Sequence, residues 1–171
     1  MRLITTVTLA IAAVAVLAVA AFASNGNQMN PAQTCKAQRT AMGEPAFKLL
    51  YGTNANRSNA FGKCVSKQAK LQEQNVLNAS ETCRAERETL GEAAFAAKYG
   101  KNKNDRNAFG KCVSQTAKAS QAAQQQKTIK AAKACKTERQ TLGAEAFRNK
   151  YGTNRNKANA FGKCVSKLVK A

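Results

Sequence analysis

The sequence predicts an all-α protein of three tandem, disulfide-pinned helical units, each with two to three helices, joined by helical connectors. A block with two cysteines occurs three times, at 35–66, 83–114 and 135–166. The three copies align with one another without gaps, and each ends in N-A-F-G-K-C-V-S. Repetition of this kind is typical of an array of similar structural units. The alternation of β-branched residues that indicates strands is missing from the sequence. Helices are therefore expected throughout.

The cysteines predict one disulfide within each unit. All six lie at matching positions of the blocks, and an exported chain with an even number of cysteines is expected to oxidise them. A unit that is copied whole most simply carries its own bridge, so the expected pairs are Cys35 with Cys64, Cys83 with Cys112, and Cys135 with Cys164. A metal site is the alternative. It is less favoured, because the chain has no His and two thiolates per block fall short of the four ligands of structural zinc.

Each unit is expected to begin with two helices that end at glycines. In the first unit Asn30 and Pro31 are typical of the start of a helix, and Gly43 is typical of its end. A second helix is expected over 44–51, with Gly52 as its left-handed stop. Corresponding glycines occur in the other two units.

The third helix of each unit is expected to follow an asparagine-rich turn. In the first unit Asn54 suits a left-handed conformation, and Asn56 suits the cap of a helix that runs from about 57 past 70. The turns superficially resemble calcium loops, but Asp105 is the only acid among the three of them. Because calcium loops rely on several carboxylates, no metal is expected there.

The two connectors predict different structures. The stretch 111–142 contains neither Gly nor Pro, so one long helix could join the second and third units. Between the first and second units, Asn78 with Glu81 resembles a capping box, so a break in the helix is expected there. The expected organisation is a signal peptide over 1–23 and helical repeats over 24–72, 78–120 and 128–171.

The N-terminal segment predicts export. Arg2 precedes an apolar run over 3–22, and Ala21 and Ala23 form an A-x-A cleavage pattern. We expect cleavage after Ala23 and a location that is secreted or at the exterior of the cell envelope. The alternative is an uncleaved N-terminal anchor, because the run is long enough to span a bilayer.

Helical spacing predicts which side chains of each unit pack together. Ala60, Phe61, Cys64 and Val65 share one face of the third helix and are expected in the core. One arginine follows the first cysteine of each block by one helical turn, and these three are expected to meet carbonyls of the asparagine turn or to lie over the tyrosine ring. The arginines are Arg39, Arg87 and Arg139.

A polar stripe on the third helix is the candidate binding site. Its residues project away from the core face and are the same in all three blocks: Asn59, Gly62, Lys63, Ser66; Asn107, Gly110, Lys111, Ser114; Asn159, Gly162, Lys163, Ser166. A glycine within a helix costs about 0.5 to 1 kcal/mol relative to Ala, so something is expected to approach closely there. It is either the first or second helix of the same unit, or a ligand or partner chain.

The charge of the chain favours anionic partners. Without residues 1–23 it has 27 Lys and Arg against 9 Asp and Glu. Such an excess attracts polyanions, so the expected partner is an anionic polymer: nucleic acid, a wall polymer or acidic lipid. The alternative is a basic surface that is merely solvated. No small-molecule substrate is inferred.

Enzymatic activity is not expected. The sequence has no His for proton transfer and no repeated pair of acids, and disulfide pairing would remove the thiols as nucleophiles. No catalytic residue, metal or cofactor is therefore assigned. The expected function is a non-enzymatic binding or interaction module for anionic polymers or envelope partners. The alternatives are a membrane-active cationic helical protein and a structural spacer.

The motif order C-x-x-x-R, Y-G-x-N-x-N and N-A-F-G-K-C-V-S resembles repeats in uncharacterised secreted bacterial proteins. The resemblance covers nearly all of the chain after residue 23. It implies export and repetition, and it brings no activity, cofactor or site residue with it.

Overall fold

The computed structural model describes residues 30–171, so the expected signal peptide over 1–23 lies outside the described residues. The described part is all-α, as predicted, and contains no strand. Its helices are α1 Pro31–Met42, α2 Glu44–Tyr51, α3 Ala60–Leu90, α4 Glu92–Tyr99, α5 Ala108–Leu142, α6 Ala144–Tyr151 and α7 Ala160–Lys170. The first helix starts as expected, because Asn30 Oδ1 accepts a hydrogen bond from Ala32 N at 2.8 Å.

Each unit is a helix, a helix of eight residues, a turn and another helix, pinned by one disulfide. The three predicted bridges, Cys35–Cys64, Cys83–Cys112 and Cys135–Cys164, are confirmed. Unit 1 consists of α1, α2 and the start of α3; unit 2 of the end of α3, α4 and the start of α5; unit 3 of the end of α5, α6 and α7. The two long helices are therefore shared between neighbouring units.

The connectors are both continuous helix. The long helix expected between units 2 and 3 is confirmed as part of α5, but the break expected at Asn78 is wrong, because α3 runs unbroken from Ala60 to Leu90. The side chain of Asn78 accepts a hydrogen bond from Gln74 Nε2 at 2.9 Å and so is satisfied within the helix. The buried Asn75 and Ala79 lie on the packed face of the same segment. Tertiary packing here overrides the local capping signal.

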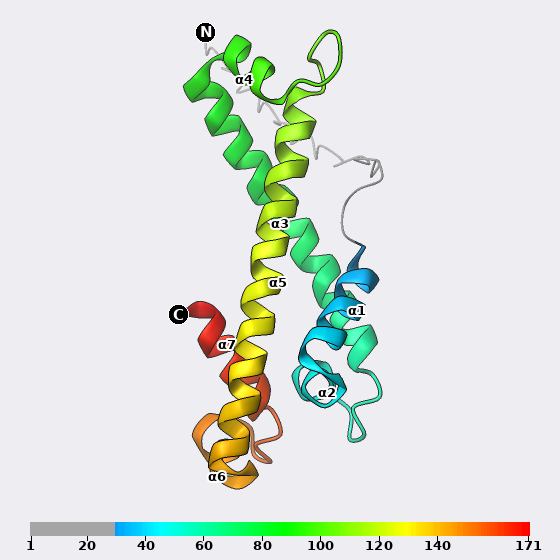
Figure 1. Cartoon of the computed structure of the whole chain (residues 1–171), viewed down its shortest axis with the longest axis vertical. Coiled ribbons are helices and arrows are strands. Elements are labelled where there is room, and N and C mark those ends of the chain that lie inside the picture. Colours follow the sequence, from blue (N-terminus) through cyan, green and yellow to red (C-terminus); the bar gives the residue numbers. More distant parts are fainter. Residues whose placement is uncertain (1–29) are drawn as a thin grey trace, which may run out of the picture.

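The chain folds back on itself, so that unit 3 meets unit 1 (Figure 1). Helices α3 and α5 run in opposite directions and cross, with α4 near one end and the remaining short helices at the other. Where α3 and α5 cross, Asn75 and Gln124 exchange hydrogen bonds of 3.5 and 3.1 Å. The units neither stack as a solenoid nor lie separately along the chain.

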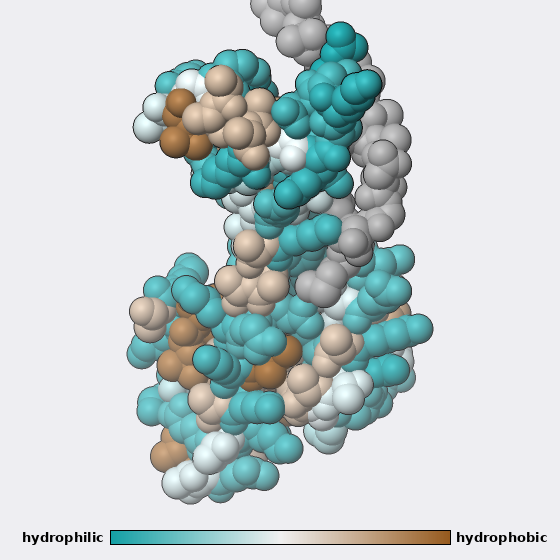
Figure 2. Space-filling view, turned by 45° about the horizontal axis from the view of Figure 1, so that its top comes forward, coloured by the Kyte–Doolittle hydropathy of each residue, from teal (hydrophilic) through white to brown (hydrophobic). Residues whose placement is uncertain are grey.

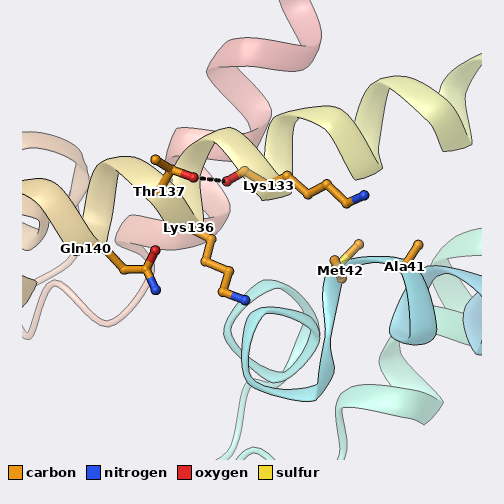
Figure 3. A pocket seen from close by; sticks show the side chains of 6 residues that line it. All are labelled: Ala41, Met42, Lys133, Lys136, Thr137 and Gln140. Atoms are coloured by element: carbon orange, nitrogen blue, oxygen red, sulfur yellow. Dashed lines mark hydrogen bonds between the residues drawn. The ribbon is translucent and has the colours of Figure 1, made fainter.

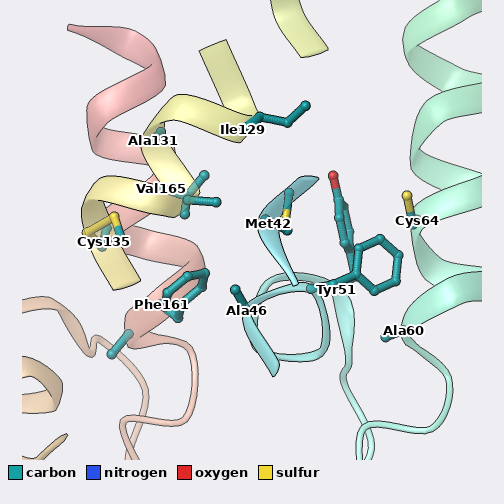
Figure 4. Packing of buried hydrophobic residues seen from close by; sticks show 14 of the residues in the cluster. Met42, Ala46, Tyr51, Ala60, Cys64, Ile129, Ala131, Cys135, Phe161 and Val165 are labelled. Atoms are coloured by element: carbon teal, nitrogen blue, oxygen red, sulfur yellow. A yellow bond between two sulfur atoms is a disulfide. The ribbon is translucent and has the colours of Figure 1, made fainter. Parts of the chain in front are cut away.

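Units 1 and 3 share one hydrophobic core, whereas unit 2 has a small core of its own. The shared core includes Met42, Ala46 and Phe47 from unit 1 and Phe161 and Val165 from unit 3. Figure 4 shows Ala46 of α2 close to Phe161 of α7. The buried residues of the small core in unit 2 are Cys83, Phe95, Ala108 and Cys112. Unit 2 therefore depends more than the others on its disulfide.

The turn before the third helix differs from the prediction. Gly52 is extended, with φ −70°, and the left-handed residue is Arg57, with φ 57°, so the conformations expected for Gly52 and Asn54 are wrong. Gly52 is required by close approach, because a Cβ there would lie 2.5 Å from Arg57 Cβ. Asn56 Oδ1 accepts from Ser58 N, within the turn, and helix α3 begins only at Ala60.

Candidate functional site

The asparagines of the polar stripe close the turn that precedes the helix. Asn59 Oδ1 accepts a hydrogen bond from Thr53 N at 3.0 Å, and its Nδ2 donates to Thr53 Oγ1 at 2.7 Å. Asn159 makes the same two bonds with Thr153. Asn107 Oδ1 accepts from Lys101 N in the second unit. These bonds explain why the three residues are identical without invoking a ligand.

The glycines of the polar stripe are mostly open. Apart from the adjacent residues and backbone of the same helix, no atom lies within 4 Å of a Cβ built at Gly62 or Gly110. At Gly162 the nearest such atom is the Leu50 carbonyl oxygen at 4.0 Å. The expectation that the first or second helix of the same unit fills this space is therefore wrong for units 1 and 2. In unit 3 the neighbour belongs to a different unit. The space beside Gly62 and Gly110 is accessible from outside.

The remaining members of the polar stripe divide between the helix and solvent. Ser66 Oγ donates back to the Gly62 carbonyl at 3.1 Å, so this hydroxyl is used within the helix. The lysines at the next position after each glycine are exposed. They are Lys63, Lys111 and Lys163. The open glycine and the exposed lysine are thus the part of each stripe that a partner could reach.

Two of the three arginines expected over the tyrosines lie over phenylalanines instead. Arg39 lies 5.5 Å from the centroid of the Phe61 ring, and Arg87 lies 5.4 Å from that of Phe109. The tyrosine hydroxyls instead donate to the residue immediately before each arginine, which is Gln38, Glu86 or Glu138. The carbonyls before the asparagine turn are met by Arg57, which the sequence interpretation did not single out.

A tyrosine–acid cluster in units 2 and 3 was not predicted from the sequence. Glu86 accepts hydrogen bonds from Lys98 Nζ at 2.6 Å and from Tyr99 OH at 2.9 Å, and these bonds, that of Lys98 first, lower the pKa of the carboxyl group. Glu138 forms the same cluster in unit 3. In unit 1 the acid is replaced by Gln38, and burial raises the pKa of Tyr51 to about 12. The cluster joins the first and second helices of each of these units.

Positive charge is concentrated in the C-terminal part of the chain. From residue 106 to the end there are 15 Lys and Arg against two acids, Glu138 and Glu145. Glu138 is paired with Lys150 at 2.6 Å. The other four ion pairs of the described residues all lie in units 1 and 2. Most cations of this part therefore have no carboxylate partner.

A shallow groove of about 390 Å³ lies between the end of α1 and helix α5 (Figure 3). Ala41 and Met42 form one side, and Lys133 and Lys136 extend from α5 on the other. Thr137 Oγ1 donates to the Lys133 carbonyl and is thereby held against its own helix. The charged residues that line the groove are both lysines, so it adds to the basic surface.

The molecule has two lobes, one formed by units 1 and 3 and the other by unit 2. The visible surface is mostly hydrophilic (Figure 2), and its hydrophobic residues are gathered in limited areas of these lobes. The large hydrophobic side chains with the greatest exposure are leucines, at 41 to 49%, scattered over α3, α5 and α7. They are Leu77, Leu90, Leu142 and Leu168. Among residues 30–171 no helix is long and apolar enough to cross a membrane.

The described residues also hold no group of three or more His, Cys, Asp or Glu side chains that could bind a metal ion. All six cysteines are in disulfides. No family model, curated protein or solved structure matches this chain.

Proposed function

We propose that the protein is a non-enzymatic binding module that holds anionic polymers outside the cytoplasm. The observation that carries this proposal is the charge of residues 106–171, where 15 Lys and Arg stand against two acids and one of those acids is already paired. A surface of this kind raises the local concentration of polyanions and speeds their association. Three disulfides are typical of an oxidising, extracellular environment.

The contact with the polymer is assigned to the polar stripe. Each exposed lysine follows a glycine, and at Gly62 and Gly110 that glycine leaves the helix backbone open to close approach. A rigid, charged chain could lie against the helix there and meet Lys63 or Lys111 from the side. The repeat of this arrangement would give one polymer several equivalent contacts, which strengthens binding without new chemistry.

Polymer binding is favoured over membrane activity because the apolar face of helix α7 is buried in the core. Membrane-active helices keep an apolar face available for the lipid boundary. Here the apolar face of α7 lies in the shared core, with Phe161 and Val165 each 3% exposed. The exposed leucines do not form such a face, because they belong to three different helices.

The test is the salt dependence of polymer binding. Duplex DNA serves as the probe, since each phosphate contact contributes about −0.9 to the slope of log affinity against log salt. The variant Lys63→Gln/Lys111→Gln/Lys163→Gln should flatten this slope by up to about 2.7. The matched control Lys36→Gln/Lys127→Gln/Lys130→Gln removes the same charge from exposed sites outside the polar stripe and should change the slope much less.

Two results would contradict the proposal. If both triple variants lose affinity alike, the polar stripe is no site and the attraction comes from net charge alone. If the oxidised wild-type protein binds neither DNA nor an anionic wall polymer near physiological salt, polymer binding itself is excluded. Helical circular dichroism of each variant checks that the fold is kept.

A further inference from the structure

A second hollow lies where unit 1 meets unit 3, and its charged walls are all basic. It has a volume of about 190 Å³, and four cations line it: Arg57, Arg139, Arg148 and Lys157. The other lining residues, which include Leu49, Phe147 and Phe161, are uncharged. A water molecule occupies roughly 30 Å³ in the liquid, so the hollow has room for a small ion with some of its hydration.

Arg57 is fixed in place at this junction. Its Nη1 donates to the carbonyls of Lys48, Leu49 and Gly52 at 3.2 to 3.4 Å, and its Nη2 donates to the Ala158 carbonyl of unit 3 at 3.2 Å. Carbonyls orient a guanidinium group but do not cancel its charge. The arginine therefore links the two units and brings an uncompensated positive charge to the wall of the hollow.

Arg139 has lost both partners that its counterparts have. Arg39 pairs with Glu44 and Arg87 with Glu92, at 3.6 and 3.8 Å, whereas the equivalent position in unit 3 is Ala144. Within residues 30–171 no carboxylate lies within 4.0 Å of Arg139. The ring that would lie beneath it, that of Phe161, is 3% exposed, because it is packed in the shared core.

The cluster is particular to this junction and is not a general property of the repeat. In unit 2 the position of Arg57 and Lys157 is taken by Asp105, and the position of Arg148 is taken by Ala96. Like charges that line one hollow repel each other, and the cost falls when an anion lies between them. Guanidinium groups bind oxyanions with short, paired hydrogen bonds, so a tetrahedral oxyanion suits this set of donors.

We propose that this junction pocket binds a phosphate-class oxyanion, either free phosphate or a phosphate group of a polymer, and thereby ties unit 3 to unit 1. The pocket does not use the lysines of the polar stripe. Binding of inorganic phosphate to it stands or falls independently of polymer binding. Because the anion contacts both units, its binding stabilises the folded state by mass action.

The experiment titrates the oxidised protein with inorganic phosphate at constant ionic strength, with calorimetry and thermal unfolding as readouts. The variant Arg139→Gln/Arg148→Gln should bind phosphate at least about tenfold more weakly, since it removes two donors of charge-assisted hydrogen bonds. These two side chains are chosen because no hydrogen bond or ion pair of theirs within residues 30–171 would be lost. The control Arg84→Gln/Arg106→Gln removes the same charge from unit 2 and should stay within about twofold of the wild type.

Phosphate also stabilises proteins weakly by exclusion from their surface, and this effect does not saturate and should be alike in all three proteins. The proposal is overturned if the wild type shows no saturable phosphate uptake, or if both double variants lose affinity equally. Linear polyphosphate then distinguishes the source of the anion. Joint loss of both ligands in Arg139→Gln/Arg148→Gln supports a polymer-borne phosphate, and loss of inorganic phosphate alone supports the free ion.

Discussion

Replacing Ala46 by Gln is expected to weaken the junction of units 1 and 3, whereas the same change at Ala94 or Ala146 is not. The three alanines occupy the same position of α2, α4 and α6. Ala46 is 2% exposed because α7 packs over it, and the other two are exposed. The three substitutions therefore differ in tertiary surroundings and not in helix position.

The size of the effect follows from this difference in burial. A larger side chain in a filled core costs typically 1 to 3 kcal/mol, and an amide buried without a partner costs roughly 1 to 3 kcal/mol more. We expect a loss of about 2 to 6 kcal/mol at Ala46. At Ala94 and Ala146 the change should remain within about 0.5 kcal/mol. The small loss of helix propensity is common to all three sites and cancels in the comparison.

The assay is thermal unfolding of the oxidised variants, followed by circular dichroism. For a chain of this size 1 kcal/mol shifts Tm by roughly 2 to 4 °C, so Ala46→Gln should lower Tm by about 4 to 24 °C. Equal shifts for all three variants would refute the reasoning, because they would mean that α2 has no more tertiary cover than α4 or α6. Rescue of Ala46→Gln by truncation of Phe161 would support the contact directly.

Three further predictions concern pH, glycine and the disulfides. Since hydrogen bonds from lysine lower the pKa of Glu86 and Glu138, the stability that these groups contribute is complete above the ordinary pKa of Glu and is lost as pH falls through the lowered values. Denaturation of Glu86→Gln/Glu138→Gln should thus vary less between pH 7 and pH 3 than that of the wild type, and an unchanged profile would count against the clusters. Gly62→Ala should raise stability by about 0.5 to 1 kcal/mol, because the space beside this glycine is open. Gly52→Ala should lower stability, because its Cβ would lie 2.7 Å from Lys48 O. Urea denaturation of the two variants tests these opposite signs. Reduction of the three bridges, each worth roughly 3 to 4 kcal/mol, should abolish most helical signal, and retention of that signal with all thiols free would contradict their role.

Much of each unit could be predicted from sequence because its signals are local. The cysteine spacing gave the bridges, and the absence of Gly and Pro over 111–142 indicated the long helix. The junction of units 1 and 3 could not be predicted in this way, since it joins residues about a hundred positions apart. One signal was available: α2 carries Leu49 and Leu50 where α4 has Ala97 and Lys98, which marks it as the short helix with an apolar outer side.

The turn and the stripe were harder to predict for different reasons. A lysine or arginine is an unusual choice for a left-handed residue, so φ 57° at Arg57 was hidden behind the asparagines beside it. The identity of Asn59 in all units suggested a binding role, but its hydrogen bonds to Thr53 give it a role in the turn. The turn thus accounts for the identity of the asparagines, whereas no close contact within residues 30–171 accounts for that of Gly62 and Gly110.

The unbroken helix α3 sets the distance between unit 1 and unit 2. With a rise of 1.5 Å per residue, its 31 residues extend roughly 45 Å from unit 1 to unit 2. Helix α5 crosses it and returns, so two struts hold the lobes apart. Under the proposed function, these helices would fix the separation between Lys63 of unit 1 and Lys111 of unit 2, and with it the spacing of their contacts along one bound polymer.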